Sequence, residues 1–105
     1  MALSKATLID LNSNELVLDL DADTSITADT DDTIHFKIAG SDEITMTATA
    51  FAPSTSDGQA LGTSSLMFSD VFLASGSVVN FNNGDVTLTH ASNLLTLDGG
   101  ALDLD

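Results

Sequence analysis

Apolar and polar residues alternate in short runs along most of this chain, and nearly every run stops at Gly, Asn, Asp or Ser. Alternation with a period of two is the pattern of a β-strand whose two faces meet different surroundings. In the clearest run, residues 32–39, one face carries Ile34, Phe36 and Ile38. Residues 43–51 repeat the pattern after the turn sequence GSD. Two alternating runs joined by such a turn predict a β-hairpin.

The remaining runs are shorter and follow one another closely. Before the hairpin lie ELVLDL and SITA, and the first fourteen residues are ambiguous between a strand and a short helix. The segment APSTSDGQA, residues 52–60, contains the only proline and is the clearest loop. After it come LMFSDVFL, SVVNF, DVTLTH, NLLTLD and ALDLD. Asn83-Gly84 is a strong turn signal, because both residues tolerate positive φ.

Strands this short cannot bury much surface within one chain, and the apolar residues are mostly small or medium, with no Trp, no Tyr and five Phe. A β-sandwich would need longer strands and larger core residues, and no strict hexapeptide or nonapeptide period supports a regular solenoid. We therefore expect an all-β, elongated, intertwined fibre, β-helical or β-prism-like, that several chains complete together, as in a trimer. Its modules would be an N-terminal β module at 1–51, a linker at 52–60 and a β shaft at 61–105.

In such an assembly, the apolar residues of the runs would meet their counterparts from other chains. The residues expected to form the trimer core or interface are Ile34, Phe36, Ile38, Phe68, Phe72, Val86, Leu88, Leu95, Leu97 and Leu102.

The charge of the chain excludes several classes of partner. Sixteen acidic residues against two basic ones give a net charge of −14, which argues against binding nucleic acid or anionic membranes. No apolar run approaches the roughly 20 residues of a membrane span, so we expect no membrane insertion. There is no cysteine for disulfides. The start of the chain lacks a signal-peptide run, so an extracellular location would require lysis or a dedicated export route.

Three aspartates offer a candidate calcium site. Asp19, Asp21 and Asp23 have the D-x-D-x-D spacing that opens an EF-hand loop. The loop pattern then fails, because Thr24 stands where Gly is needed and Thr30 where Glu is needed. Solvated carboxylates in a turn are the favoured interpretation, with bound calcium as the alternative.

The two histidines differ in the face they are expected to occupy. His35 alternates with apolar neighbours beside Lys37, which predicts a surface residue. His90 has the parity of Val86 and Leu88, so a threefold assembly would present three imidazoles at one level. Three imidazoles could bind a metal, although a lone histidine is more often a hydrogen-bonded core or edge residue. No other cofactor is expected.

No catalytic pattern is visible. Ser75 lies in ASGS, which lacks the leading glycine of a nucleophile elbow. Paired carboxylates could cleave a glycoside, but a sugar cleft usually has aromatic platforms, and Trp and Tyr are absent. We expect no enzyme activity. A glycan-degrading spike fragment is the weakest of the alternatives.

Apolar bulk is concentrated around Ser69-Asp70, which indicates either a sticky patch or, as we favour, a subunit interface. This stretch resembles a motif of bacteriophage tail-fibre and tailspike proteins, L-G, then an aromatic-x-D-apolar-aromatic-L core, then G. Its positions here are Leu61, Gly62, Phe68, Asp70, Val71, Phe72, Leu73 and Gly76. The family usually has Trp at the position of Phe68 and often Tyr at that of Phe72.

The resemblance implies a parallel homotrimer located in the virion, where a fibre shaft supports attachment to the host. Its partners would be other tail proteins and a host surface receptor or glycan. The alternative from another class is a monomeric, calcium-binding repeat of a bacterial surface adhesin, with the aspartates of residues 19–32 as ligands.

Overall fold

A computed structural model describes residues 10–105 and shows an all-β chain with antiparallel sheets, as the alternating runs predict. The chain divides into two compact units, Met1–Ser64 and Ser65–Asp105. Residues 52–60 lie within the first unit. The ambiguous first run falls almost wholly on residues 1–9, outside the described residues.

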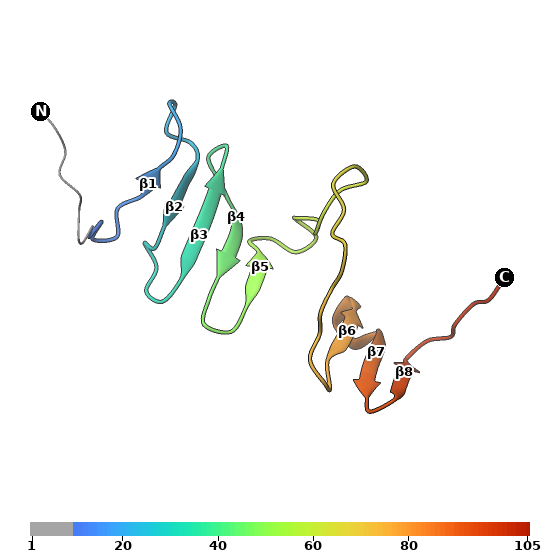
Figure 1. The fold of residues 1–105 in the computed structure, drawn as a ribbon. Helices are drawn as coiled ribbons and strands as arrows, with labels where there is room; N and C mark the ends of the chain where they lie inside the picture. Colours follow the sequence, from blue (N-terminus) through green and yellow to red (C-terminus); the bar gives the residue numbers. More distant parts are fainter. Residues whose placement is uncertain (1–9) are drawn as a thin grey trace, which may run out of the picture. The chain divides into compact units, whose positions relative to one another are not determined.

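The first unit is built on a five-stranded sheet in which each strand pairs antiparallel with the next along the chain. Figure 1 shows the strands side by side in sequence order. Their bounds are Leu16–Val17 (β1), Ser25–Thr27 (β2), Ile34–Ile38 (β3), Ser41–Met46 (β4) and Phe51–Pro53 (β5).

The predicted hairpin is confirmed as β3 and β4, but its turn lies earlier than the GSD sequence suggests. Ile38 pairs with Ser41, and the two residues between them, Ala39 and Gly40, have φ of 51° and 81°. Two positive φ values define the tight turn whose twist suits a hairpin, and Gly40 adopts one at no steric cost.

The single strand expected over 43–51 is wrong. β4 stops at Met46, and the amide of Thr47 donates to the carbonyl of Ala50 at 2.9 Å, which closes a turn. The chain then returns as β5, which includes Pro53 from the segment expected to be a loop. Proline lacks an N–H donor, and an edge strand such as β5 tolerates that loss.

A β-bulge lies in the middle of the hairpin. Phe36 pairs with Ile44, but the next residue, Lys37, pairs with Asp42, so β4 carries one extra residue. Simple alternation would place Asp42 on the face of Ile44. The bulge turns Asp42 onto the opposite face, beside Lys37.

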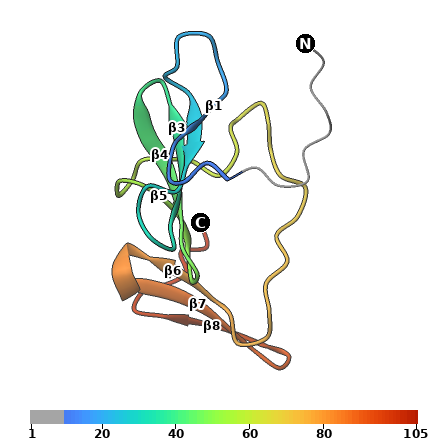
Figure 2. The same cartoon turned by 90° about the vertical axis from the view of Figure 1, so that its left-hand side faces the viewer.

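The second unit contains a three-stranded antiparallel sheet, with the strands again in sequence order. Its elements are Val78–Phe81 (β6), the short 3-10 turn Asn82–Gly84 (η1), Val86–Ala91 (β7) and Leu94–Asp98 (β8). The turn predicted at Asn83-Gly84 is confirmed, with φ of 55° and 95°. Residues 66–73 and 101–105, expected as β runs, form no strand, and Figure 2 shows them as irregular chain.

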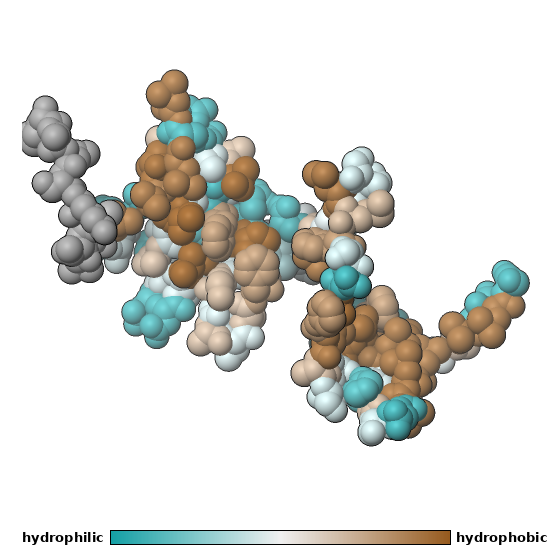
Figure 3. Space-filling view, viewed as in Figure 1, coloured by the Kyte–Doolittle hydropathy of each residue, from teal (hydrophilic) through white to brown (hydrophobic). Residues whose placement is uncertain are grey.

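Neither unit has an apolar core of its own. Among residues 10–105, no hydrophobic side chain is buried, and the two buried residues are Ser25 and Thr27, at 2% and 3% exposure. Apolar atoms lie open on the surface, including the region of β6–β8 in Figure 3. Folded domains normally gain most of their stability from burying such atoms. Each sheet therefore presents an apolar face whose side chains stay at least partly exposed among the described residues.

Candidate functional site

The first uncovered surface is the apolar face of β1–β5. The register aligns one residue from each strand into a row that crosses the whole sheet: Leu16, Ile26, Phe36, Ile44 and Pro53. A second row joins Ile34, Met46 and Phe51, which are 41%, 46% and 66% exposed. Because side chains alternate along a strand, both rows lie on the same side of the sheet.

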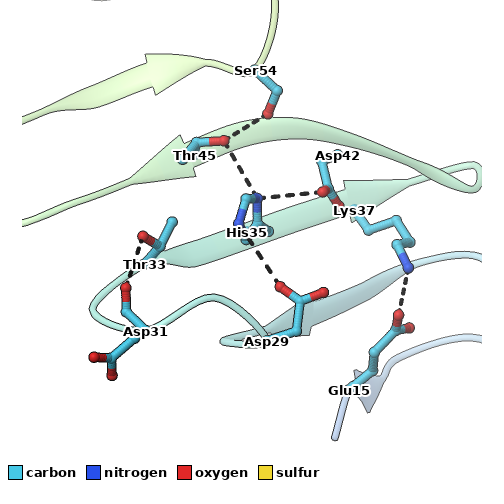
Figure 4. A network of polar contacts seen from close by, with 9 residues as sticks. All are labelled: Glu15, Asp29, Asp31, Thr33, His35, Lys37, Asp42, Thr45 and Ser54. Carbon is cyan, nitrogen blue, oxygen red and sulfur yellow. Dashed lines mark hydrogen bonds and ion pairs between the residues drawn. The ribbon is translucent and has the colours of Figure 1, made fainter. Parts of the chain in front are cut away.

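The opposite face of this sheet is polar, and it is the better buried of the two. Cross-strand pairing brings Thr27, His35 and Thr45 into one row and Ser25 and Lys37 into the next. Figure 4 shows His35 linked to Asp29 and Asp42, and Lys37 linked to Glu15. In the same view, Thr45 is linked to His35 and Ser54. The polar face therefore makes most of its contacts within the sheet, although the Thr27 hydroxyl and His35 Nε2 have no hydrogen-bond partner among the described residues.

Lys37 and Glu15 form an ion pair across this polar face, with Ser25 as a third member. The Lys37 ammonium donates to Glu15 Oε1, and the Ser25 hydroxyl donates to Glu15 Oε2 at 3.0 Å. The hydrogen bond from Lys37, followed by that from Ser25, lowers the pKa of Glu15. The same contact with Glu15 raises the pKa of Lys37. This pair holds β3 to the segment that leads into β1.

The prediction that His35 is a plain surface residue is wrong. Its side chain is 17% exposed, and Nδ1 lies 3.3 Å from Asp42 Oδ2 and 3.5 Å from the hydroxyl of Thr45. Nε2 lies 3.9 Å from Asp29 Oδ1. The sequence pattern missed this cluster because only the bulge brings Asp42 to the side of His35.

The three aspartates of the candidate calcium site lie in the loop between β1 and β2. One carboxylate oxygen from each of Asp19, Asp21 and Asp23 lies within 4.8 Å of the others. Asp19 accepts from the amide of Thr24 at 3.2 Å, and hydrogen bonding by Thr24 lowers the pKa of Asp19. Burial, followed by the charge of Asp21, raises the pKa of Asp23. Three carboxylates supply only part of the six to eight oxygens that calcium takes.

The second uncovered surface is the apolar face of β6–β8. The register pairs Val79 with Leu88 and Leu88 with Leu97, and it pairs Phe81 with Val86 one step along. The other face is mixed: it carries three threonines, including Thr89 beside Thr96, two further polar residues and three apolar ones. Leu95 and Phe81 are 66% and 52% exposed.

His90 lies on this apolar face opposite Leu95, as its parity predicts. The amide of Gly76 donates to His90 Nδ1 at 3.3 Å. A neutral imidazole that accepts at Nδ1 carries its proton on Nε2. Binding a metal through Nε2 would therefore need the other tautomer and the loss of the Gly76 contact.

Two grooves flank Leu88 and Leu95 on this face, and both leucines line each groove. One, of about 380 Å³, is bordered by Val71, Leu73 and His90. The other, of about 400 Å³, is lined by Phe81, Leu88, Leu95, Leu97, Ala101 and Leu102. The second groove thus has no polar or charged side chain in its lining.

The residues expected at a trimer interface fall into three places. Ile34, Phe36 and Ile38 lie on β3 and share one face of the first sheet. The residues on the second sheet are Val86, Leu88, Leu95 and Leu97. The residues outside the strands are Phe68 and Phe72, before β6, and Leu102, which lines the 400 Å³ groove.

Comparison with known proteins found no matching family model, curated protein or solved structure. Within residues 10–105, no helix has the length and apolar character required to cross a bilayer. The candidate site is therefore defined by the molecule itself, as two apolar sheet faces that other chains could cover.

Proposed function

We propose that this chain is a structural module of a phage tail fibre or tailspike, and that three copies form a homotrimeric shaft which supports attachment to a host. One observation carries the proposal. Both sheets have an apolar face, and no hydrophobic residue of the described chain is buried. A soluble chain with such faces needs a partner, and identical chains offer identical faces.

The antiparallel order of the strands favours the β-prism-like form of the expected assembly over the β-helical form. Each sheet is a set of consecutive hairpins with one apolar side. Three such sheets packed with their apolar sides inward would enclose a core, which corresponds to the β-prism-like form. The polar side, with its ion pair and hydrogen bonds, would face water. The role is mechanical, and no catalysis is required of any residue.

The tail-fibre resemblance supports the same proposal. Within the motif region, Phe68, Val71 and Phe72 are 63%, 68% and 94% exposed. Exposed aromatic residues at the positions where the resembled family usually carries Trp or Tyr suit contacts between chains rather than within one. The virion location, the tail partners and the host receptor or glycan rest on this resemblance.

Light scattering of the purified chain tests the proposal. We expect a solution mass three times the 10.8 kDa of one chain. We also expect the trimer to resist SDS without heating, because losing a subunit would require unfolding. A stable, folded monomer would refute the proposal.

The alternative is a monomeric, calcium-binding adhesin repeat, and the convergence of Asp19, Asp21 and Asp23 favours it. The two functions predict opposite results with EDTA. The adhesin repeat should lose its fold in EDTA and have the mass of one chain. The fibre module should keep both its β-structure and its trimer mass in EDTA.

A further inference from the structure

We infer that Phe72 of one copy inserts into the 400 Å³ apolar groove of a second copy, so that each chain donates one phenylalanine and receives another. This inference rests on the proposed self-assembly and assigns it a contact. The groove lies on the apolar face of β6–β8 and is lined by Phe81, Leu88, Leu95, Leu97, Ala101 and Leu102. We call it the Leu102 groove.

The direction of Phe72 supports its role as a donor. Val71 and Leu73 both line the smaller groove, which contains His90 in the same unit. Phe72 stands between them, is 94% exposed and lines neither groove. In extended chain, neighbouring side chains point to opposite sides. Val71 and Leu73, which are 68% and 58% exposed, thus border a groove of their own sheet, while Phe72 lies on the other side of the segment.

Charge selects the place where two copies can meet. Each chain carries a net charge of −14, so copies repel one another wherever their carboxylates approach. The lining of the Leu102 groove contains no ionisable residue, and its volume exceeds that of one phenyl side chain. In contrast, the hollow beside Ala28 in the first unit is lined by Asp29, Asp31 and Asp32. Two smaller grooves of the first unit, of about 220 and 210 Å³, also lack ionisable residues, but their linings include polar side chains such as Gln59 and Asn14. The Leu102 groove is lined by apolar side chains alone, which favours it as the place where a like-charged copy docks.

The contact is heterologous, because a protruding side chain on one copy meets a groove on the next. Contacts of this kind form closed rings when the rotation between copies returns to the start, and open filaments when it does not. A closed ring of three agrees with the proposed trimer. Phe72 would also gain an aromatic neighbour, Phe81, in the groove that receives it.

Single cysteines placed in separate chains test the contact directly, because the native chain has no cysteine. Phe72→Cys and Ala101→Cys variants are coexpressed, so a disulfide between these positions must join two chains. We expect a disulfide-linked dimer after mild oxidation. The matched control replaces Ala101→Cys by Thr96→Cys, on the other face of β8, and should give no such dimer.

Light scattering on the same samples distinguishes a failure of this inference from a failure of the proposed function. A trimer in which Phe72→Cys does not link to Ala101→Cys overturns this inference and leaves the proposed function standing. So does a trimer in which Phe72→Cys links instead to Ile44→Cys on the first sheet. A folded monomer refutes the proposed function itself, and the inference falls with it.

A Phe72→Trp variant gives a second readout that keeps an aromatic side chain in place. The native chain has no Trp, so the fluorescence would come from this position alone. We expect the emission to shift to the blue on assembly, because the groove of the other copy is apolar. Trimers whose emission remains that of a water-exposed Trp would overturn the inference.

Discussion

The two sheets of this chain differ in the polar contacts that each makes between its own side chains. The first, β1–β5, has a polar face closed by its own contacts, from the Lys37–Glu15 pair to the 2.8 Å contact between the hydroxyls of Thr45 and Ser54. In the second, β6–β8, no hydrogen bond joins two side chains of the described strand residues. Both leave an apolar face open.

The difference indicates how each sheet would depend on the proposed assembly. Cross-strand polar contacts specify the register of the first sheet even before another copy arrives. Charged side chains within β6–β8 are few, with Asp98 the only acidic residue in the strands. The strands of the second sheet therefore carry fewer acidic side chains than those of the first, where β4 alone has Asp42 and Glu43.

The largest effect is expected from a charge on the apolar face of the second sheet. Leu88 lines both grooves, and Leu88→Asp would place a carboxylate where the assembly excludes water, at a cost of several kcal/mol. We expect the variant to lose the trimer in light scattering.

The neighbouring change Thr87→Asp is the matched control, because Thr87 lies on the opposite face of the same strand. It should retain the trimer. If Leu88→Asp assembled as well as Thr87→Asp, the apolar face of β6–β8 would not be an interface.

Replacing one glycine next to each sheet by alanine compares the strain that the two backbones tolerate. Gly99 and Gly40 have φ of 80° and 81°, but a Cβ on Gly99 would lie 2.1 Å from the carbonyl oxygen of Asp85, whereas Gly40 has open space. Gly40→Ala should lower the free energy of unfolding by about 1–2 kcal/mol, from the left-handed backbone alone. Gly99→Ala should lower it by about 2–5 kcal/mol, since overpacking adds to that strain.

Chemical denaturation of both variants measures the contrast. Equal losses would mean that the end of β8 can move away from Asp85 without cost.

The sequence allowed the β class, the β3–β4 hairpin and the Asn83-Gly84 turn to be predicted, because each depends on local alternation or turn chemistry. The end of β4 and the return at β5 were missed, since the alternation of ATAF continues through a turn that tertiary pairing imposes. Asp42 was expected in the turn, as the last residue of GSD, but it lies in β4, where a one-residue bulge brings it opposite Lys37.

The burial of His35 was not predicted, for a different reason. His35 was read as exposed because periodicity assigns a residue to a face but does not say which face is covered. In the described chain, the polar face of the first sheet is the buried one, with Ser25 and Thr27 at its centre. The alternation does place Ile34, Phe36 and Ile38 on one face of β3, but it cannot say what covers that face.

A smaller effect is expected at Thr27, whose buried hydroxyl has no hydrogen-bond partner among the described residues. Thr27→Val keeps the shape of the side chain and removes an unsatisfied group, so the free energy of unfolding should rise by about 1 kcal/mol. The control is Thr45→Val, which removes a hydroxyl that contacts Ser54. It should lower that free energy by about 1 kcal/mol. Thermal denaturation of the two variants compares them, and a loss in Thr27→Val would show that its hydroxyl has a partner.

The smallest effect is expected from the Lys37–Glu15 pair, because both side chains are partly exposed, at 23% and 34%. The pKa of Glu15 is lowered from its ordinary value of 4.5, so the pair's contribution is present above that pH and is lost as pH falls through the folded value. The pKa of Lys37 is raised from 10.5, so on the alkaline side the contribution is lost only as pH rises past the folded value. Glu15→Gln should remove the acid-side loss.

Hydrogen exchange of the β2 and β3 amides, followed from neutral pH into the range of carboxylate titration, measures this contribution within the first sheet. Asp19→Asn is the matched control, because the pKa of Asp19 is also lowered, but by Thr24 rather than by a cation. Added salt should weaken the protection of native and Asp19→Asn protein and leave Glu15→Gln nearly unchanged, since screening acts on the ion pair. If Glu15→Gln responded to salt as strongly as the native chain, the ion pair would contribute no stability to the first sheet. The contrast between the two sheets would then rest on the His35 and Thr45 contacts alone.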